Sequence, residues 1–190
     1  SLRSTGCRHP RLQPFGGAHD GYWAACNGVV YPTAVRSENL VHSLEHGAVW
    51  IAYNPDQVSG DALSTLSKKV DGERYMVMSP YPGLDSPVSL QSWGHQLKVP
   101  DVNDPRIDEF ISSLKQNQYT HPEVGASCDA TGPGAFDQDN PPPFAAGQRN
   151  GGRVGEMGDR QVLEQRVQAV GERVVVEILQ LENGADVLRD

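Results

Sequence analysis

The chain has little cysteine. Only Cys7, Cys26 and Cys128 occur in 190 residues, and no two of them form a CxxC pair. This scarcity excludes a zinc ribbon, which needs two close CxxC pairs, and a thioredoxin-type dithiol site. Cys26 and Cys128 border the best-patterned region and lie in glycine-rich, turn-like surroundings. We therefore expect a disulfide between them, which indicates a location outside the reducing cytosol.

Long apolar runs and basic clusters are also absent. No run approaches the roughly 20 apolar residues that span a bilayer, so we expect a soluble domain. The 16 lysines and arginines are outnumbered by 24 acidic residues, and the formal net charge of -8 opposes nucleic-acid binding. Neither GxSxG nor HExxH occurs, so the signatures of a serine hydrolase and of a zinc peptidase are missing. The start at Ser1, without a basic and apolar leader, is typical of a mature or trimmed product.

What the sequence does contain is a pair of histidines one helical turn apart. His42 and His46 lie in a predicted helix over residues 37–47. On a helical wheel they fall almost opposite the apolar residues, so we expect both rings to point away from the packed face. Two imidazoles placed in this way can bind one zinc, copper, nickel or iron ion. The alternative is a solvated polar face that carries two titrating histidines.

Three other residues are candidates for the same site. His19 lies in a glycine-rich loop that can fold back over the helix as a third ligand, or it is simply a turn histidine. His95 lies at a predicted bulge, where its side chain can be re-aimed as a fourth ligand. Glu45 falls at the edge of the histidine face, where it can orient an imidazole or act as a general base toward a metal-bound water. His9 and His121 are expected to face solvent.

Two methionines raise the question of copper. Met76 and Met78 alternate in a predicted strand and therefore share one face. Thioethers would favour Cu(I) if that face met the histidines. The alternative is that both side chains fill the core, because Met packs readily into irregular gaps.

Helices and strands alternate along the central part of the chain. Periodicity predicts helices over 37–47, 63–70 and from 104, and strands over 48–54, 75–79 and 87–99, the last with a bulge at Gly94. Residues 14–33 are predicted to be loop. This order favours one compact α+β or α/β domain with three to four strands and about three helices. Strand, helix, strand, strand, helix is also the order in the second half of a thioredoxin-like fold.

We expect four segments along the chain. Residues 1–13 are a flexible leader and residues 14–128 a globular domain. Residues 129–160 are rich in Pro and Gly and are predicted to be a linker. In residues 161–190 the apolar spacing fits either one helix or a helix followed by a strand.

The HSLEHG sequence at 42–47, followed by a hydrophobic strand that ends in Tyr53-Asn54-Pro55, resembles an uncharacterised bacterial family, domain of unknown function 3105. The resemblance covers roughly residues 14–128 and also includes the sequences at 16–19, 79–84, 92–94 and 107–110. It implies a secreted or membrane-anchored protein whose domain lies on the outer face of the membrane. It implies no particular reaction, because the family has no settled biochemical activity.

Three functional hypotheses follow. The first is an extracytoplasmic metal-binding protein of the cell envelope, which holds copper or zinc through His19, His42, His46 and His95. The second is a non-catalytic structural or interaction domain of an envelope assembly, with an envelope protein as its partner and with buried histidines that only organise the fold. Under each hypothesis we expect the domain to be tethered to the membrane in the full-length protein. The third is a metal-dependent hydrolase with Glu45 as base. An enzyme is the least favoured of these, because no set of acid, base and nucleophile is recognisable.

Overall fold

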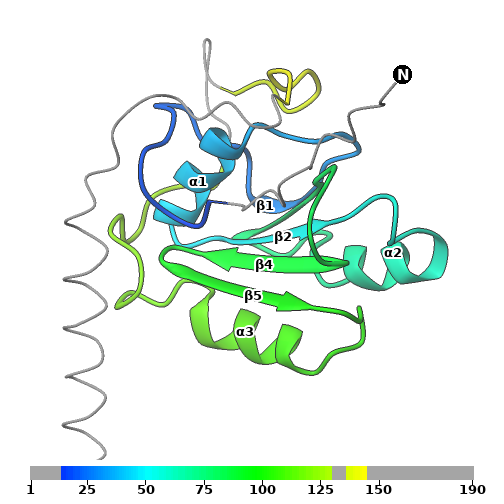
Figure 1. Cartoon of the computed structure of the whole chain (residues 1–190). Coiled ribbons are helices and arrows are strands. Elements are labelled where there is room, and N and C mark those ends of the chain that lie inside the picture. The colour runs from blue at the N-terminus through cyan, green and yellow to red at the C-terminus, as the bar shows by residue number, and fades with distance from the viewer. Residues whose placement is uncertain (1–13, 130–135, 145–190) are drawn as a thin grey trace, which may run out of the picture. The chain divides into compact units, whose positions relative to one another are not determined.

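The computed structural model of the chain describes residues 14–129 and 136–144, and it shows an α+β fold built on a five-stranded sheet (Figure 1). The elements, in chain order, are β1 (Asn27–Val30), α1 (Ser37–Glu45), β2 (Val49–Tyr53), α2 (Gly60–Ser67), β3 (Met76–Pro80), β4 (Val88–Ser92), β5 (His95–Val99) and α3 (Arg106–Leu114). The strand order is β1-β3-β2-β4-β5. The first three strands in that order are parallel, and β4 and β5 are antiparallel to their neighbours. The α+β class is confirmed, although the sequence predicts only three to four strands.

Two strands were missed in the sequence, and the reason differs for each. The sequence predicts a loop where β1 lies, because Asn27-Gly28 is typical of a turn and the strand has only four residues with an irregular register at this point. The predicted strand 87–99 is instead the hairpin of β4 and β5. Gly94 does not form a bulge. It has a φ of 72°, which allows the two-residue turn that pairs Ser92 with His95.

From β2 onward, the element order is strand, helix, three strands and helix, which is one strand more than the order predicted for the second half of a thioredoxin-like fold, because the predicted strand 87–99 is a hairpin. β2 and β3 are parallel, and the β4–β5 hairpin continues the sheet beside β2. No cysteine occurs in residues 49–114, so the likeness is one of topology and does not indicate redox chemistry.

The sheet has a separate apolar core on each face. Leu40 and Leu44 of α1 belong to the core that contains Trp50 on one face, and Leu66 of α2 and Ile107 of α3 belong to the core on the other face. β2 is buried along its whole length, as expected for a central strand covered on both faces. α1 covers the sheet face that carries Trp50 (Figure 1).

The ends of the chain are described only in part. The predicted leader, residues 1–13, and the predicted C-terminal segment, residues 161–190, lie outside the described residues. Within the predicted linker, the rings of Phe136 and Phe144 pack against Tyr31 and Tyr81, so this part of it is in contact with the domain core. In the described ranges, no helix has the length and apolar character needed to cross a membrane.

Candidate metal centre

Two loops cover the polar side of α1. The entry loop, residues 14–26, precedes β1, and the strap, residues 117–129, follows α3 (dark blue and yellow-green in Figure 1). Main-chain hydrogen bonds from Ala24 and Glu123 to carbonyls of α1 hold both loops against it. The sequence predicts a histidine face that points away from the apolar stripe of the helix. This face is covered, because residues distant in the sequence fold over it.

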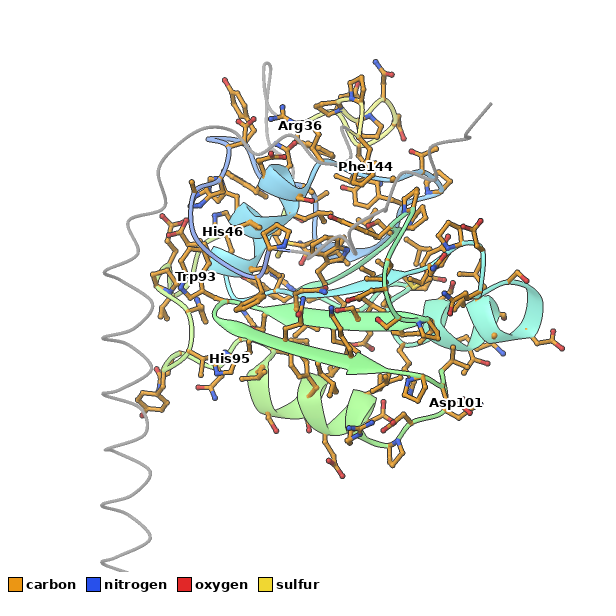
Figure 2. All side chains as sticks on the ribbon, viewed as in Figure 1. Arg36, His46, Trp93, His95, Asp101 and Phe144 are labelled. Carbon is orange, nitrogen blue, oxygen red and sulfur yellow. A yellow bond between two sulfur atoms is a disulfide. The ribbon has the colours of Figure 1, made fainter. Side chains whose placement is uncertain are left out.

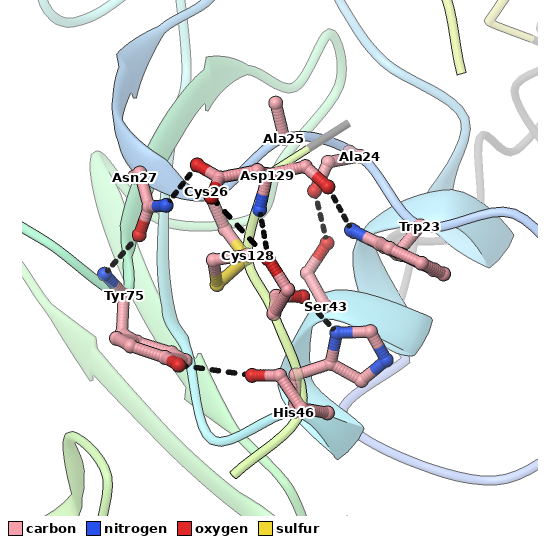
Figure 3. Close-up of a disulfide and its surroundings, with 12 residues drawn as sticks. Trp23, Ala24, Ala25, Cys26, Asn27, Ser43, His46, Tyr75, Cys128 and Asp129 are labelled. Atoms are coloured by element: carbon pink, nitrogen blue, oxygen red, sulfur yellow. Dashed lines mark hydrogen bonds between the residues drawn. A yellow bond between two sulfur atoms is a disulfide. The ribbon is translucent and has the colours of Figure 1, made fainter. Parts of the chain in front are cut away.

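A disulfide between Cys26 and Cys128 joins the entry loop to the strap, which confirms the predicted pairing. Both cysteines are fully buried, and Cys26 N donates a hydrogen bond to Cys128 O at 2.9 Å. Beside the disulfide, Trp23 Nε1 donates to Asp129 O at 3.1 Å, as Figure 3 shows. The two loops thus form a cross-linked frame around α1.

Three histidine rings gather inside this frame. The ring centroid of His42 is 4.7 Å from that of His19 and 4.8 Å from that of His46. The loop histidine therefore folds back onto the helix pair. The Trp23 ring packs against both helix histidines, with centroids 5.4 Å from His42 and 4.7 Å from His46. It covers the two rings on the entry-loop side.

All three rings have the same orientation with respect to the main chain. A carbonyl oxygen only accepts hydrogen bonds, so a ring nitrogen that is bonded to one must carry hydrogen. This fixes the tautomer and leaves Nε2 as the nitrogen that can bind a metal, as is usual for metal-ligating histidines. The three Nδ1 atoms donate to main-chain carbonyls, from His19 to Gly17 O at 2.8 Å, from His42 to Asp20 O at 2.7 Å and from His46 to Ser127 O at 2.7 Å.

Carboxylates approach the Nε2 atoms. Glu45 Oε2 is 2.7 Å from His19 Nε2, and Glu123 Oε2 is 3.1 Å from His46 Nε2. Glu45, predicted to be an outer partner, thus contacts the very nitrogen that would bind the ion. His42 Nε2 has no hydrogen-bond or ion-pair partner within the described ranges. The ligand atoms form two groups that share His42, one with His19 and Glu45 and one with His46 and Glu123.

In each group, the distances between the ligand atoms are close to those in a metal site. Within each group the ligand atoms lie no more than 4.8 Å apart. Tetrahedral ligands at a metal–nitrogen distance of about 2.0–2.1 Å are about 3.4 Å apart, so each pair of ligand atoms must approach by about 1.4 Å at most. The groups compete for the single available nitrogen of His42, because its Nδ1 is bonded to Asp20. The geometry therefore fits one ion per chain.

Burial controls the protonation of His46, which is only 2% exposed. Burial lowers the pKa of His46, and the neighbouring His42 acts in the same direction. Hydrogen bonding to Ser127 O and the charges of Glu123 and Glu45 raise the pKa, but burial prevails. A neutral His46 presents the lone pair of Nε2 to the Glu123 carboxylate at 3.1 Å. Two acceptors in contact repel each other unless a cation, either a proton or a metal ion, lies between them.

Three candidate residues lie apart from this cluster. His95 is in neither ligand group, and its Nδ1 donates to Trp93 O at 2.7 Å. Figure 2 shows it at β5, away from His46, which directly follows α1. It begins an edge strand, whereas the prediction placed it at a bulge that could turn toward the helix. Met76 and Met78 are buried in the core on the sheet face opposite α1, so their thioethers fill that core.

Two residues of the strap were missed. His121 was expected to face solvent, but it is 7% exposed, and its Nδ1 donates to Glu45 O at 3.2 Å at the end of α1. Glu123 carries a candidate ligand atom and has no local sequence pattern that connects it to the histidines. The predicted disulfide could have indicated Glu123, because a bond from Cys128 to Cys26 brings the residues before Cys128 close to the entry loop.

Comparison with known proteins gives one result. A family described as a protein of unknown function (DUF3105) matches residues 4–130. No curated protein and no solved structure matches the chain significantly. The matched region includes the entry loop, α1 and the strap, so all five candidate ligands lie within the family's domain.

Proposed function

The chain belongs to the family of proteins of unknown function DUF3105, and we propose that its histidine cluster binds one zinc or copper ion. One observation carries this proposal. Three histidines have Nδ1 tied to carbonyls, and their remaining nitrogens lie in two groups that share His42, each with one carboxylate. Such an arrangement defines a tautomer and gathers negative charge, and both favour a cation over an empty polar cluster.

The donor set restricts the kind of ion. The gathered atoms are imidazole nitrogens and carboxylate oxygens, which suit Zn²⁺ and Cu²⁺. Cu⁺ prefers sulfur, and the methionines considered for that role lie across the sheet. We assign the central position to His42, with His46 and Glu123 or His19 and Glu45 completing the coordination.

We further propose that the domain handles this metal at the cell envelope, outside the cytosol. The support is the buried disulfide, since such bonds persist in oxidising compartments. A hydrolytic role has less support, because Glu45, the base that it would need, is in an ion pair with His19.

A second candidate is a structural or interaction domain of an envelope assembly. It is favoured by the two contacts between an imidazole Nε2 and a carboxylate, His19 with Glu45 and His46 with Glu123, because a proton between the two atoms in each contact would satisfy the cluster without metal. In the metal-binding candidate, a metal ion lies between the imidazole Nε2 atoms and the carboxylate oxygens. In the structural candidate, a proton lies there and no metal ion is required.

Titration calorimetry of the untagged, oxidised domain with ZnCl₂ and CuCl₂ separates the candidates. We expect one ion per wild-type chain, no binding to His42→Ala and unchanged binding to His95→Ala. His95 is the matched control because it is also a histidine with Nδ1 bonded to a carbonyl, yet it lies outside both groups. Absence of binding to the wild type, or equal affinity of His42→Ala, would refute metal binding and leave the structural candidate.

A further inference from the structure

We propose that the Cys26–Cys128 disulfide controls the metal affinity of the histidine cluster, so that the oxidised domain holds the ion and the reduced domain releases it. This inference rests on the metal-binding function proposed above. It makes the metal affinity of the site depend on the redox state of the disulfide, although the candidate ligands themselves, histidine and glutamate, are not oxidised or reduced under ordinary conditions.

The strap carries what His46 needs to act as a ligand. Ser127 O accepts the hydrogen bond from Nδ1 and so fixes the tautomer, and Glu123 lies at Nε2. Ser127 directly precedes Cys128, so the cross-link anchors this carbonyl from the adjacent residue. When the strap leaves, His46 loses both partners.

The disulfide also reaches the other side of the site. Cys26 ends the entry loop, which carries His19 and the Asp20 carbonyl that receives His42 Nδ1. The bond therefore ties together the two loops that enclose all three histidines. Figure 3 shows the disulfide between them, with His46 on the strap side.

The strap has little apolar packing that would keep it closed without the bond. Its largest apolar side chains, Tyr119 and Val124, are 87% and 61% exposed. Segments with few buried apolar contacts open at low free-energy cost. The remaining attachments are the buried ring of His121 and a set of single hydrogen bonds, such as those from Tyr75 Oη to Ala126 O at 2.9 Å and from Trp23 Nε1 to Asp129 O at 3.1 Å.

The chemical step is thiol–disulfide exchange with a dithiol reductant. One thiolate of the reductant attacks a sulfur of the Cys26–Cys128 bond, which forms a mixed disulfide and releases the other cysteine as a thiolate. The second thiolate of the reductant then attacks the reductant's own sulfur in the mixed disulfide and releases the second cysteine thiolate. The two cysteine thiolates take up the protons that the reductant thiols lost, so the products are two cysteine thiols and the oxidised, cyclic form of the reductant. Because both cysteines are fully buried, the exchange requires the strap to open. A metal held by His46 and Glu123 opposes this opening, so metal binding and reduction are reciprocally coupled.

The test compares zinc affinity with the bond present and absent. Replacing Cys26 and Cys128 together by Ser removes the bond and leaves no partner for Cys7. We expect this variant to bind zinc about 10–100-fold more weakly than the oxidised wild type, the range for loss of outer partners of metal ligands. Leu66→Ala is the matched control, because it destabilises the core on the opposite sheet face, and its zinc affinity should equal that of the wild type.

If circular dichroism shows that the double variant does not fold, Tyr75→Phe replaces it. This substitution removes only the hydrogen bond to Ala126 O, and it should weaken zinc binding several-fold, whereas Tyr53→Phe on the other face should not. Wild-type affinity in the folded double variant, or in Tyr75→Phe when that variant replaces it, overturns the redox inference and leaves metal binding standing. Equal weakening in Leu66→Ala overturns it too, because general stability then explains the effect. Absence of zinc binding to the oxidised wild type overturns the proposed function itself.

Discussion

His46→Ala should destabilise the domain even without metal. His46 is 2% exposed, and its ring contacts Trp23 and His42. Truncating a large buried side chain to Ala costs about 2–5 kcal/mol, and leaving a buried carbonyl such as Ser127 O unpaired costs about 1–3 kcal/mol. The Glu123 side chain is 49% exposed, so water can enter the space that the imidazole leaves and can offset part of the lost stability. We expect the free energy of unfolding to fall by about 2–4 kcal/mol.

Urea denaturation at pH 7.5 in the presence of a chelator measures this change without a contribution from bound metal. His46→Asn is the informative companion, because its amide can still donate to Ser127 O, and it should lose about half as much. His95→Ala, at the edge of the sheet, should lose less than about 1 kcal/mol. A His46→Ala variant within about 0.5 kcal/mol of the wild type, or an Asn variant as unstable as the Ala variant, would refute the reasoning.

The same residue makes stability depend on pH. Burial lowers the pKa of His46 in the folded protein, so on acidification the unfolded chain takes up its proton first, near an unperturbed value of about 6.5. The stabilisation from neutral His46 is therefore complete above this pH and is lost as pH falls through the folded-state pKa. The stability difference between the wild type and His46→Asn should shrink on acidification. A difference that stays constant from pH 8 to pH 5 contradicts the buried, neutral histidine.

Other substitutions test separate parts of the structure. Gly47→Ala should cost about 1–3 kcal/mol, because φ is +91° and the added Cβ would meet His121 Nε2 at 2.7 Å; an unchanged thermal melt contradicts this packing. Met78→Leu should leave copper and zinc affinities unchanged in calorimetry, since its thioether lies in the opposite core, and weaker binding would show that it reaches the site. Copper(II) should quench tryptophan fluorescence strongly, and Trp23→Phe should remove much of that quenching because Trp23 contacts two of the histidines; equal quenching in the variant would place the ion elsewhere.

The local features of α1 could be predicted from the sequence. The spacing of His42 and His46 puts both rings on one helical face, and the apolar residues Leu40, Val41 and Leu44 determine which face packs on the sheet. The disulfide partners were also recognisable, because a chain with few cysteines offers few pairings. These conclusions depend on periodicity and counting, which need no knowledge of distant contacts.

Periodicity could not show what covers that face. The alternative of a solvated histidine face is wrong, and periodicity could not exclude it, because the covering groups come from residues 14–26 and 117–129, which have no regular apolar pattern. Glu123 and Ser127 reach His46 from about 80 residues away in sequence, and the Ser127 contact uses a main-chain carbonyl that every residue type has. His95 was misplaced for the converse reason, since a glycine reads alike at a bulge and at a hairpin turn.

The sequence by itself thus determined the histidine pair, its helix, the apolar strands and the pairing of Cys26 with Cys128. Only the tertiary structure decided that His19 joins the pair, that carboxylates from α1 and the strap face the Nε2 atoms, and that the methionines lie across the sheet. The physical reason is that helical and strand periods are properties of neighbouring residues. A ligand cluster depends on side-chain directions and carbonyl positions that are set when loops without any period close over the core.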